Sequence, residues 1–318
     1  MHRPKHRIRS LITALACLAT ISCMQAEKVS LDTSGTQGLL LGSLSFEFGL
    51  FGGGSGGGGG TPQTISGTVT GLLSSSTISI QNAGGETIGI SANGSFNFTT
   101  PTYNYSVTIT AQPSSLRCIV LNGSGAATGP VSNIIVTCPM AVQNGLIWMR
   151  CSHGQTWAAA TGTCTGSATT VQFCSDYCHD GNGAGEAGNV NGHLNGNGTS
   201  QAFSACNSLN TTNGGAGAFG INNWRVPWKT ELKALVYCSN GTPTPLADSS
   251  NCGAGYSIPT INTALFPGTM AGVNERYWSS SASYSSPGVR AYSVSFETGA
   301  TSDGYNQPNL YHLRCVAQ

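Results

Sequence analysis

Cysteine is the residue that most constrains how this chain can fold. Eight of its twelve cysteines lie in residues 139–318, and two more, Cys118 and Cys138, come shortly before. The chain begins with the basic stretch MHRPKHRIRS and the apolar run LITALACLATISC, a pattern typical of an export signal. Exported proteins reach compartments in which disulfides form and persist. We therefore expect a disulfide-held fold, although eight cysteines alone allow on the order of a hundred pairings.

The N-terminal sixty residues predict export and anchoring. Residues 1–22 are the expected signal peptide, and Cys23 lies where a bacterial lipoprotein carries its lipidated cysteine, although Thr20 replaces the usual Leu of the lipobox. Cleavage after Ala26, giving a secreted or periplasmic protein, is the alternative. Residues 23–60 end in GGGSGGGGG, which is typical of a flexible tether. We expect a lipid-anchored protein at the outer membrane or cell surface, with no other membrane contact.

Charge is scarce in this chain. Only 8% of the residues are charged, and thirteen Lys and Arg stand against twelve Asp and Glu. Four of these cations lie in residues 1–22, so the remaining chain is slightly acidic. A nucleic-acid-binding protein needs a basic face to neutralise phosphates, so we expect no nucleic-acid partner. The 44 glycines do not indicate disorder, because hydrophobic residues make up 39% of the chain.

Residues 61–138 predict a small all-β domain. Apolar and polar side chains alternate in seven short runs: ISGTVTGL, TISIQN, ETIGIS, SFNFT, NYSVTIT, LRCIVLN and VSNIIVTC. Turn signals such as Asn93-Gly94 separate them, which favours an antiparallel Ig-like sandwich with a Cys118–Cys138 disulfide. Through its ANGSF turn and its final Val-Thr-Cys, the segment also resembles the Ig-like modules of bacterial surface proteins. That resemblance implies a spacer or adhesive module.

Residues 139–318 show few helical patterns. Apolar residues share one face over 200–210, and again after Pro227, which favours a short helix at each place. Residues 292–296 alternate as a strand, and residues 311–315 alternate as its expected partner. With the cysteines, this predicts an α+β domain held by disulfides.

Four motifs occur in this domain. They are Gly-Leu-Ile-Trp-Met-Arg at 145–150, Asn-Trp-Arg-Val-Pro at 223–227, Tyr-Trp-Ser-Ser at 277–280 and Leu-Arg-Cys-Val at 313–316. In this order they resemble the Lcl C-terminal domain family of bacterial exported proteins, over about 144–318. The motif residues to which we assign a structural role are Trp148, Trp224, Arg225, Pro227, Glu231, Tyr277, Trp278 and Arg314.

The resemblance carries implications for the fold. It implies a domain similar to C-type lectins and to the formylglycine-generating-enzyme scaffold. It also implies the pair Cys206–Cys315. Cys151–Cys164 and Cys238–Cys252 are the expected local pairs, which leaves Cys174 and Cys178 for each other. Family members usually carry a helix-capping Thr after the motif proline, where this chain has Trp228, so the cap comes from elsewhere or is absent. Glu231 is expected to anchor Arg225 or a helix end.

Catalytic patterns are weak. A hydrolase needs a nucleophile with a base or two paired carboxylates, and no spacing pairs the eight acids of residues 139–318. The histidines, among them His153 and His312, stand alone in the sequence. We therefore expect no enzymatic activity and no cofactor. An enzyme on the formylglycine-generating scaffold is the alternative, and it would need reactive cysteines.

Some residues are candidates for binding. Asp180, Asn182 and Glu186 offer oxygen ligands on a Gly-rich loop, which makes it a candidate calcium site; a solvated insertion is the alternative. The aromatic residues Tyr284, Tyr305 and Trp228 are candidate ligand contacts, with packing in the sheet or core as the alternative.

The expected function follows from this order of parts. The hypothesis is a non-catalytic surface lipoprotein of adhesin type, whose lectin-like head binds a glycan or an extracellular matrix protein. A structural envelope protein that docks a partner chain is the alternative. The sequence does not determine the oligomeric state.

Overall fold

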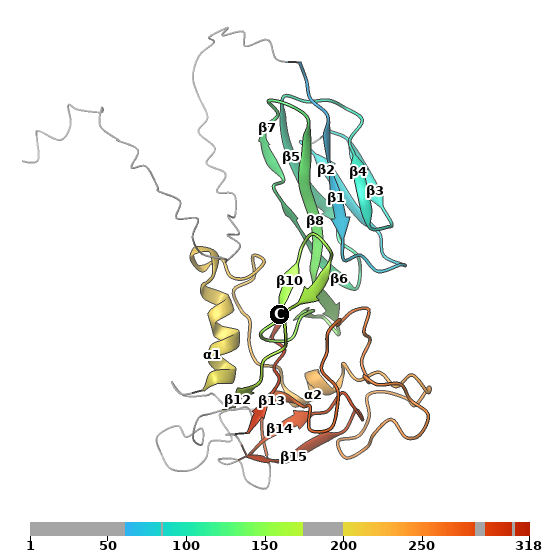
Figure 1. Ribbon diagram of the computed structural model, residues 1–318, viewed down its shortest axis with the longest axis vertical. Helices are drawn as coiled ribbons and strands as arrows, with labels where there is room; N and C mark the ends of the chain where they lie inside the picture. The colour runs from blue at the N-terminus through green and yellow to red at the C-terminus, as the bar shows by residue number, and fades with distance from the viewer. Residues whose placement is uncertain (1–60, 84, 174–199, 284–289, 307–308) are drawn as a thin grey trace, which may run out of the picture. The chain divides into compact units, whose positions relative to one another are not determined.

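The computed structural model describes residues 61–83, 85–173, 200–283, 290–306 and 309–318 (Figure 1). This part of the chain is mostly β-sheet, with two short α-helices and four disulfides. The first eight strands are β1 (Ile65–Thr70), β2 (Ile78–Asn82), β3 (Thr87–Ile90), β4 (Gly94–Asn97), β5 (Asn104–Ala111), β6 (Leu116–Leu121), β7 (Ser124–Ala126) and β8 (Val131–Gln143). Each of the seven alternating runs predicted from the sequence contains a strand, and β7 is an addition.

These strands form two sheets around one core. The strand order is β3-β2-β5-β7 in one sheet, whereas the other contains β4, β1 and β8, with β6 also paired to β8. Alternate residues of β1 and β2 are buried, because a strand turns successive side chains to opposite faces. Ile65, Ile80, Val107 and Ile134 from both sheets meet in this core.

Strand β8 continues past the predicted domain boundary at 138/139. Its second half pairs with β9 (Leu146–Met149), and β9 pairs in turn with β17 (Val316–Ala317) at the end of the chain. One sheet therefore contains strands from both predicted domains, as Figure 1 shows where β8 runs down from the sandwich. The hydrophobic core likewise runs from the sandwich to Trp148, Phe266 and Phe296.

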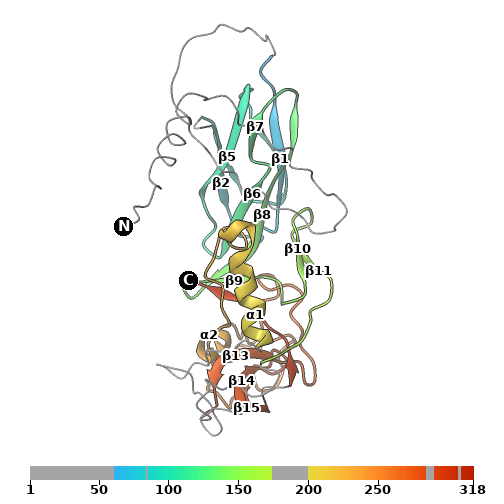
Figure 2. The ribbon, with the colours of Figure 1, turned by 90° about the vertical axis from the view of Figure 1, so that its left-hand side faces the viewer.

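The remaining elements are short. They are β10 (Thr156–Ala158), β11 (Thr163–Thr165), β12 (Val171–Gln172), α1 (Gln201–Asn207), α2 (Lys229–Lys233), β13 (Tyr277–Ala282), β14 (Arg290–Val294), β15 (Thr301–Asn306) and β16 (Leu310–Tyr311). Both helices lie where the sequence predicted them. In Figure 2, α1 lies in front of β9, with the β10–β11 hairpin to its right in the view.

One strand pairing predicted from the sequence is wrong. Residues 311–315 do not pair with β14, whose partners are β13 and β15. Instead β16 pairs with β12, and β17 extends the large sheet. Alternation predicts that a segment is a strand but does not identify its partner. Both edges of β14 are already paired, one with β13 and the other with β15.

The β10–β11 hairpin packs closely against the end of β1. Thr70 donates a hydrogen bond to the Ala159 carbonyl at 2.5 Å, and the Trp157 indole N–H donates to Thr137 Oγ1 at 2.8 Å. At Gly162, whose φ is +68°, a Cβ atom would lie 2.2 Å from the Gly71 nitrogen. This contact therefore requires glycine at position 162.

Candidate functional site

The family-motif residues lie mostly in the core. Trp148, Trp224, Tyr277, Trp278 and Arg314 are almost completely buried. Their indole and hydroxyl groups have partners within the chain: the Trp278 indole, for example, donates to the Val171 carbonyl at 2.9 Å. Pro227 is buried, and its carbonyl accepts a hydrogen bond from the Ser280 N–H at 2.8 Å. These contacts account for a structural role of the motifs.

Glu231 anchors both Arg225 and the start of α2, the two alternatives that the sequence left open. Its carboxylate accepts hydrogen bonds from two Arg225 nitrogens, at 2.6 and 2.8 Å, and from the Trp228 N–H at 2.7 Å. The first turn of α2 is capped by a residue of strand β13, because Ser281 Oγ accepts a hydrogen bond from the Lys229 N–H at 3.0 Å. The cap that Trp228 cannot supply therefore comes from elsewhere.

Two buried arginines join distant segments. Arg150 donates to the carbonyls of Gly71, Cys138, Ala264 and Leu265 at 2.7 to 2.9 Å. Burial lowers its pKa to about 10, so it stays charged at neutral pH. Arg314 donates to the carbonyls of residues 149 and 150 and to the hydroxyls of residues 152 and 269, and burial lowers its pKa. Their positive charges are thus solvated by protein dipoles, within the part of the chain that is described.

The structure also pairs His312, which appeared isolated in the sequence. Its ring Nε2 contacts the carboxylate of Glu275, and its ring lies 5.4 Å from that of Tyr277. His312 is only 3% exposed, so this pair is part of the buried packing around Tyr277.

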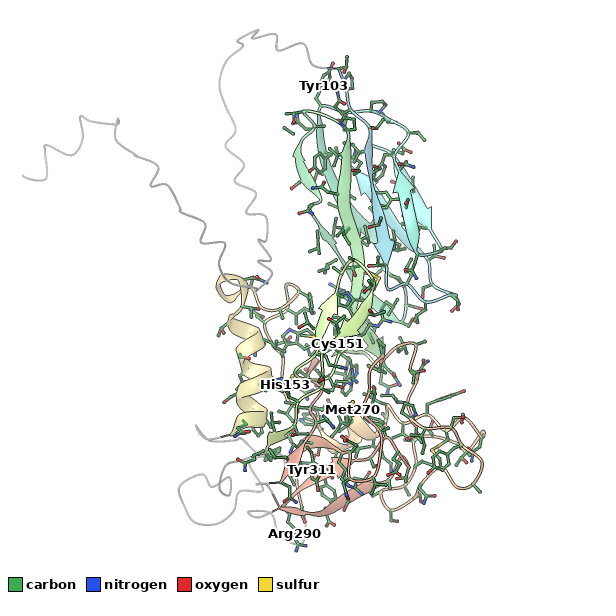
Figure 3. All side chains as sticks on the ribbon, viewed as in Figure 1. Tyr103, Cys151, His153, Met270, Arg290 and Tyr311 are labelled. Carbon is green, nitrogen blue, oxygen red and sulfur yellow. A yellow bond between two sulfur atoms is a disulfide. The ribbon has the colours of Figure 1, made fainter. Side chains whose placement is uncertain are left out.

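A pocket opens beside the Cys151–Cys164 disulfide. It has a volume of about 220 Å³ and lies beside the buried cluster of Met140, Trp224 and Trp278, against which Met149, Leu209 and Phe219 pack while staying partly exposed. Its lining is Pro139, Met149, Cys151, Ser152, His153, Gly154, Gln155, Thr156, Trp157, Leu209, Ala218, Phe219 and Cys315. Figure 3 labels Cys151 and His153, between the β10–β11 hairpin and the β13–β15 sheet in that view.

Two backbone features shape the pocket wall. Phe219 has a φ of +57° and precedes Gly220 at +77° in a tight turn between Ala218 and Ile221. A bulky residue in this left-handed region carries strain of about 1 to 3 kcal/mol, and such strain is often found at functional sites. On the other wall, Gly154 has a φ of +88°, and a Cβ there would lie 2.4 Å from Thr169 Oγ1.

Most polar groups at the pocket already have partners. Ser152 Oγ bonds to the Tyr277 hydroxyl at 2.7 Å, and the Gln155 side chain bonds to the Ser152 N–H and to the Gly268 carbonyl. Desolvation lowers the pKa of His153, so its imidazole is neutral at pH 7. The described lining therefore carries no charge at neutral pH.

Of the ligand contacts expected from the sequence, Trp228 does not line this pocket. Trp228 is 36% exposed and stacks on the Arg225 guanidinium, 4.9 Å from its ring centre, at the start of α2. Tyr305 lies on β15, where its backbone is opposite Ala291. Tyr284 lies outside the described residues. The wall residues Met149, Leu209 and Phe219 were not predicted from the sequence. Gly154, Gly217 and Gly220, whose backbones are left-handed, are the local signals for the turns beside them.

Four of the five expected disulfides are present. They are Cys118–Cys138, Cys151–Cys164, Cys206–Cys315 and Cys238–Cys252. Cys174–Cys178 and the calcium candidates Asp180, Asn182 and Glu186 lie outside the described residues. Among the residues that the structure does describe, no group of three or more metal-ligating side chains occurs. No helix in this part of the chain is long and apolar enough to cross a membrane.

Comparison with known proteins agrees with the motifs. A search of curated proteins finds no match, and neither does a search of solved structures. The family model of the Lcl C-terminal domain matches residues 141–317, which is more than half of the chain. This match covers the buried motif residues, all of the pocket lining except Pro139, and three of the four disulfides, and the chain therefore belongs to the Lcl C-terminal domain family.

Proposed function

We propose that this chain is an exported, non-catalytic binding protein of adhesin type that recognises a glycan or a matrix component outside the cell. In this proposal Cys23 carries a lipid anchor and residues 23–60 form a tether. The two-sheet unit is an Ig-like spacer, and the rest is a C-type-lectin-like head. The order of these parts supports the proposal, because it separates a folded head from a membrane.

The pocket is the observation that carries the proposal. A concave, mostly apolar site with a few polar groups is what a ligand-binding pocket requires. The Cys151–Cys164 and Cys206–Cys315 disulfides each contribute a residue to its wall, which reduces the ordering needed on binding. Arg150, Arg314 and Lys233 are hydrogen-bonded inside the protein. They are therefore not available as a surface for polyanions, and we expect a ligand of low charge.

The test is a binding screen with the whole exported chain. A Cys23→Ser variant, purified from an oxidising compartment so that its disulfides form, would be applied to a glycan array and to immobilised matrix proteins. We expect saturable binding to a weakly charged ligand. This binding should be retained at about 0.5 M salt, because salt screens only interactions between charges and these contribute little here. The same protein after reduction and alkylation is the control. Equal signals from native and reduced protein on every surface would overturn the proposal.

A further inference from the structure

We propose that the pocket receives one uncharged aromatic or aliphatic side chain from an extracellular protein partner, and not a sugar ring. This inference rests on the proposed function and specifies its ligand. It is carried by the size of the pocket, by the chemistry of its walls and by the strained turn at Phe219.

Size limits the occupant to a single ring or branched side chain. The cavity holds about 220 Å³, and a cavity of about 150 Å³ lined by apolar side chains is large enough for benzene. An oligosaccharide would therefore lie mostly outside. One side chain that projects from a protein surface would fit within it.

The walls favour an apolar group. Pro139, Met149, Leu209, Ala218 and Phe219 present carbon, and the lining carries no charge at neutral pH. A sugar ring would bring several hydroxyls into this site, and each hydroxyl buried without a partner costs about 1 to 3 kcal/mol. Ser152 and Gln155 already make hydrogen bonds within the chain, so only part of their bonding capacity is left for those hydroxyls.

His153 adds one polar feature to the pocket. Its neutral imidazole lines the cavity and makes no hydrogen bond with another side chain among the described residues. It can therefore exchange a hydrogen bond with a single hydroxyl. A tyrosine side chain, which joins an apolar ring to one hydroxyl, combines the two requirements.

The turn at Phe219 is the independent observation. Glycine would occupy its left-handed backbone at no cost, yet the chain places a phenylalanine there, on the pocket wall. Strain of this kind persists where the side chain has a use. We assign that use to an edge or face contact with the ring of the incoming side chain.

The test uses p-cresol, the side-chain analogue of tyrosine, and methyl glucoside as the sugar probe. Binding to the Cys23→Ser chain would be followed by ligand-observed NMR and titration. We expect p-cresol to bind with a dissociation constant on the order of 1 mM, as is reasonable for a fragment of this size, and methyl glucoside not to bind. Sugar binding without p-cresol binding would overturn the inference and make the pocket a glycan site.

Two variants with a matched control locate the binding. Ala218→Leu fills the pocket, whereas Ala216→Leu makes the same change at an exposed position two residues earlier. We expect p-cresol to bind about tenfold more weakly to the first and unchanged to the second. Phe219→Gly removes a wall and relieves the left-handed strain, so it should weaken binding without impairing folding. Unchanged binding to Phe219→Gly would contradict the proposal even if Ala218→Leu failed to fold.

The same variants separate this inference from the proposed function. If the screen finds a protein ligand that Ala218→Leu still binds, the adhesin function stands and the pocket assignment fails. If the screen finds no ligand at all but p-cresol binds, the pocket chemistry stands and the proposed function fails.

Discussion

At the scale of single residues, this protein uses cations as internal hydrogen-bond donors. Arg150 meets four backbone carbonyls, and Lys233 donates to the Gly299 carbonyl at 2.8 Å. Burial lowers the pKa of Lys233 to about 8, the largest cause being its desolvation. Carbonyl dipoles can hold such charges only when several converge, because a buried charge without partners is strongly destabilising. Although charged residues are scarce in this sequence, the buried cations Arg150 and Lys233 are therefore needed for the fold.

His153 should make the free energy of unfolding depend on pH below neutrality. Burial lowers its pKa in the folded chain, so the unfolded chain binds a proton at a higher pH than the folded chain does. The free energy of unfolding should therefore fall as the pH drops below 6.5, the pKa of an exposed histidine. Urea unfolding at pH 8 and pH 5 measures this loss, which should be smaller in His153→Asn. Equal losses in the two proteins would contradict the sign of the shift.

Glu231 makes a second residue-level prediction. Replacing it by Ala removes the ion pair with Arg225 and the acceptor of the Trp228 N–H, so unfolding should become easier by about 2 kcal/mol. Glu231→Gln keeps a carbonyl acceptor and should lose about half as much. Denaturant midpoints measure both changes. A wild-type midpoint for Glu231→Ala would mean that solvent competes fully for this partly exposed pair.

At the scale of elements, the β10–β11 hairpin offers a matched pair of glycines. Gly162 and Gly166 have similar left-handed φ values, +68° and +79°. A Cβ at Gly162 would meet the backbone of Gly71, whereas at Gly166 the nearest atom is 3.8 Å away. Alanine at either position should cost about 1 kcal/mol of conformational strain, and at Gly162 about 2 kcal/mol more from the collision. Thermal or urea unfolding of both variants tests this, and equal losses would show that the contact with β1 is loose.

The sequence predicted elements better than their partners. Alternation located β1 to β6 and β8, because one buried face leaves a period of two in the chain. The same signal at 311–315 led to a wrong pairing, since alternation does not identify the neighbouring strand. The pocket could not be predicted, because its walls come from β8, β9, residues 151–157 and the turn at 218–221, which only tertiary contacts bring together. Phe219 in particular has no sequence signal for its left-handed backbone.

At the scale of the whole molecule, the two predicted domains share structure. Strand β8 belongs to both, and the core is continuous between them. Arg150 donates hydrogen bonds to the carbonyls of Gly71 and Cys138 on one side and of residues 264 and 265 on the other. A unit connected in this way should unfold as one, because the loss of either side leaves buried groups of the other without partners.

We therefore predict that residues 139–318 expressed alone do not reach their native state. The fragment lacks half of the acceptors of Arg150 and the first half of β8. A buried charge that loses its partners costs about 3 to 5 kcal/mol, a large part of the 5 to 15 kcal/mol by which a domain is stable. All five tryptophans lie in this fragment, so their fluorescence reports mainly on it, with Trp157 also sensing its contact with Thr137, whereas far-UV circular dichroism reports on all the sheets.

In the whole chain both signals should change at one denaturant concentration, and the fragment should show no cooperative transition. An Arg150→Met variant of the whole chain separates the two causes, since it removes the buried charge and keeps β8. If that variant still unfolds in one step, the shared strand is what couples the two parts. Two separate transitions in the wild-type chain would contradict the prediction, and the head would then be an independent domain despite the strand that joins it to the sandwich.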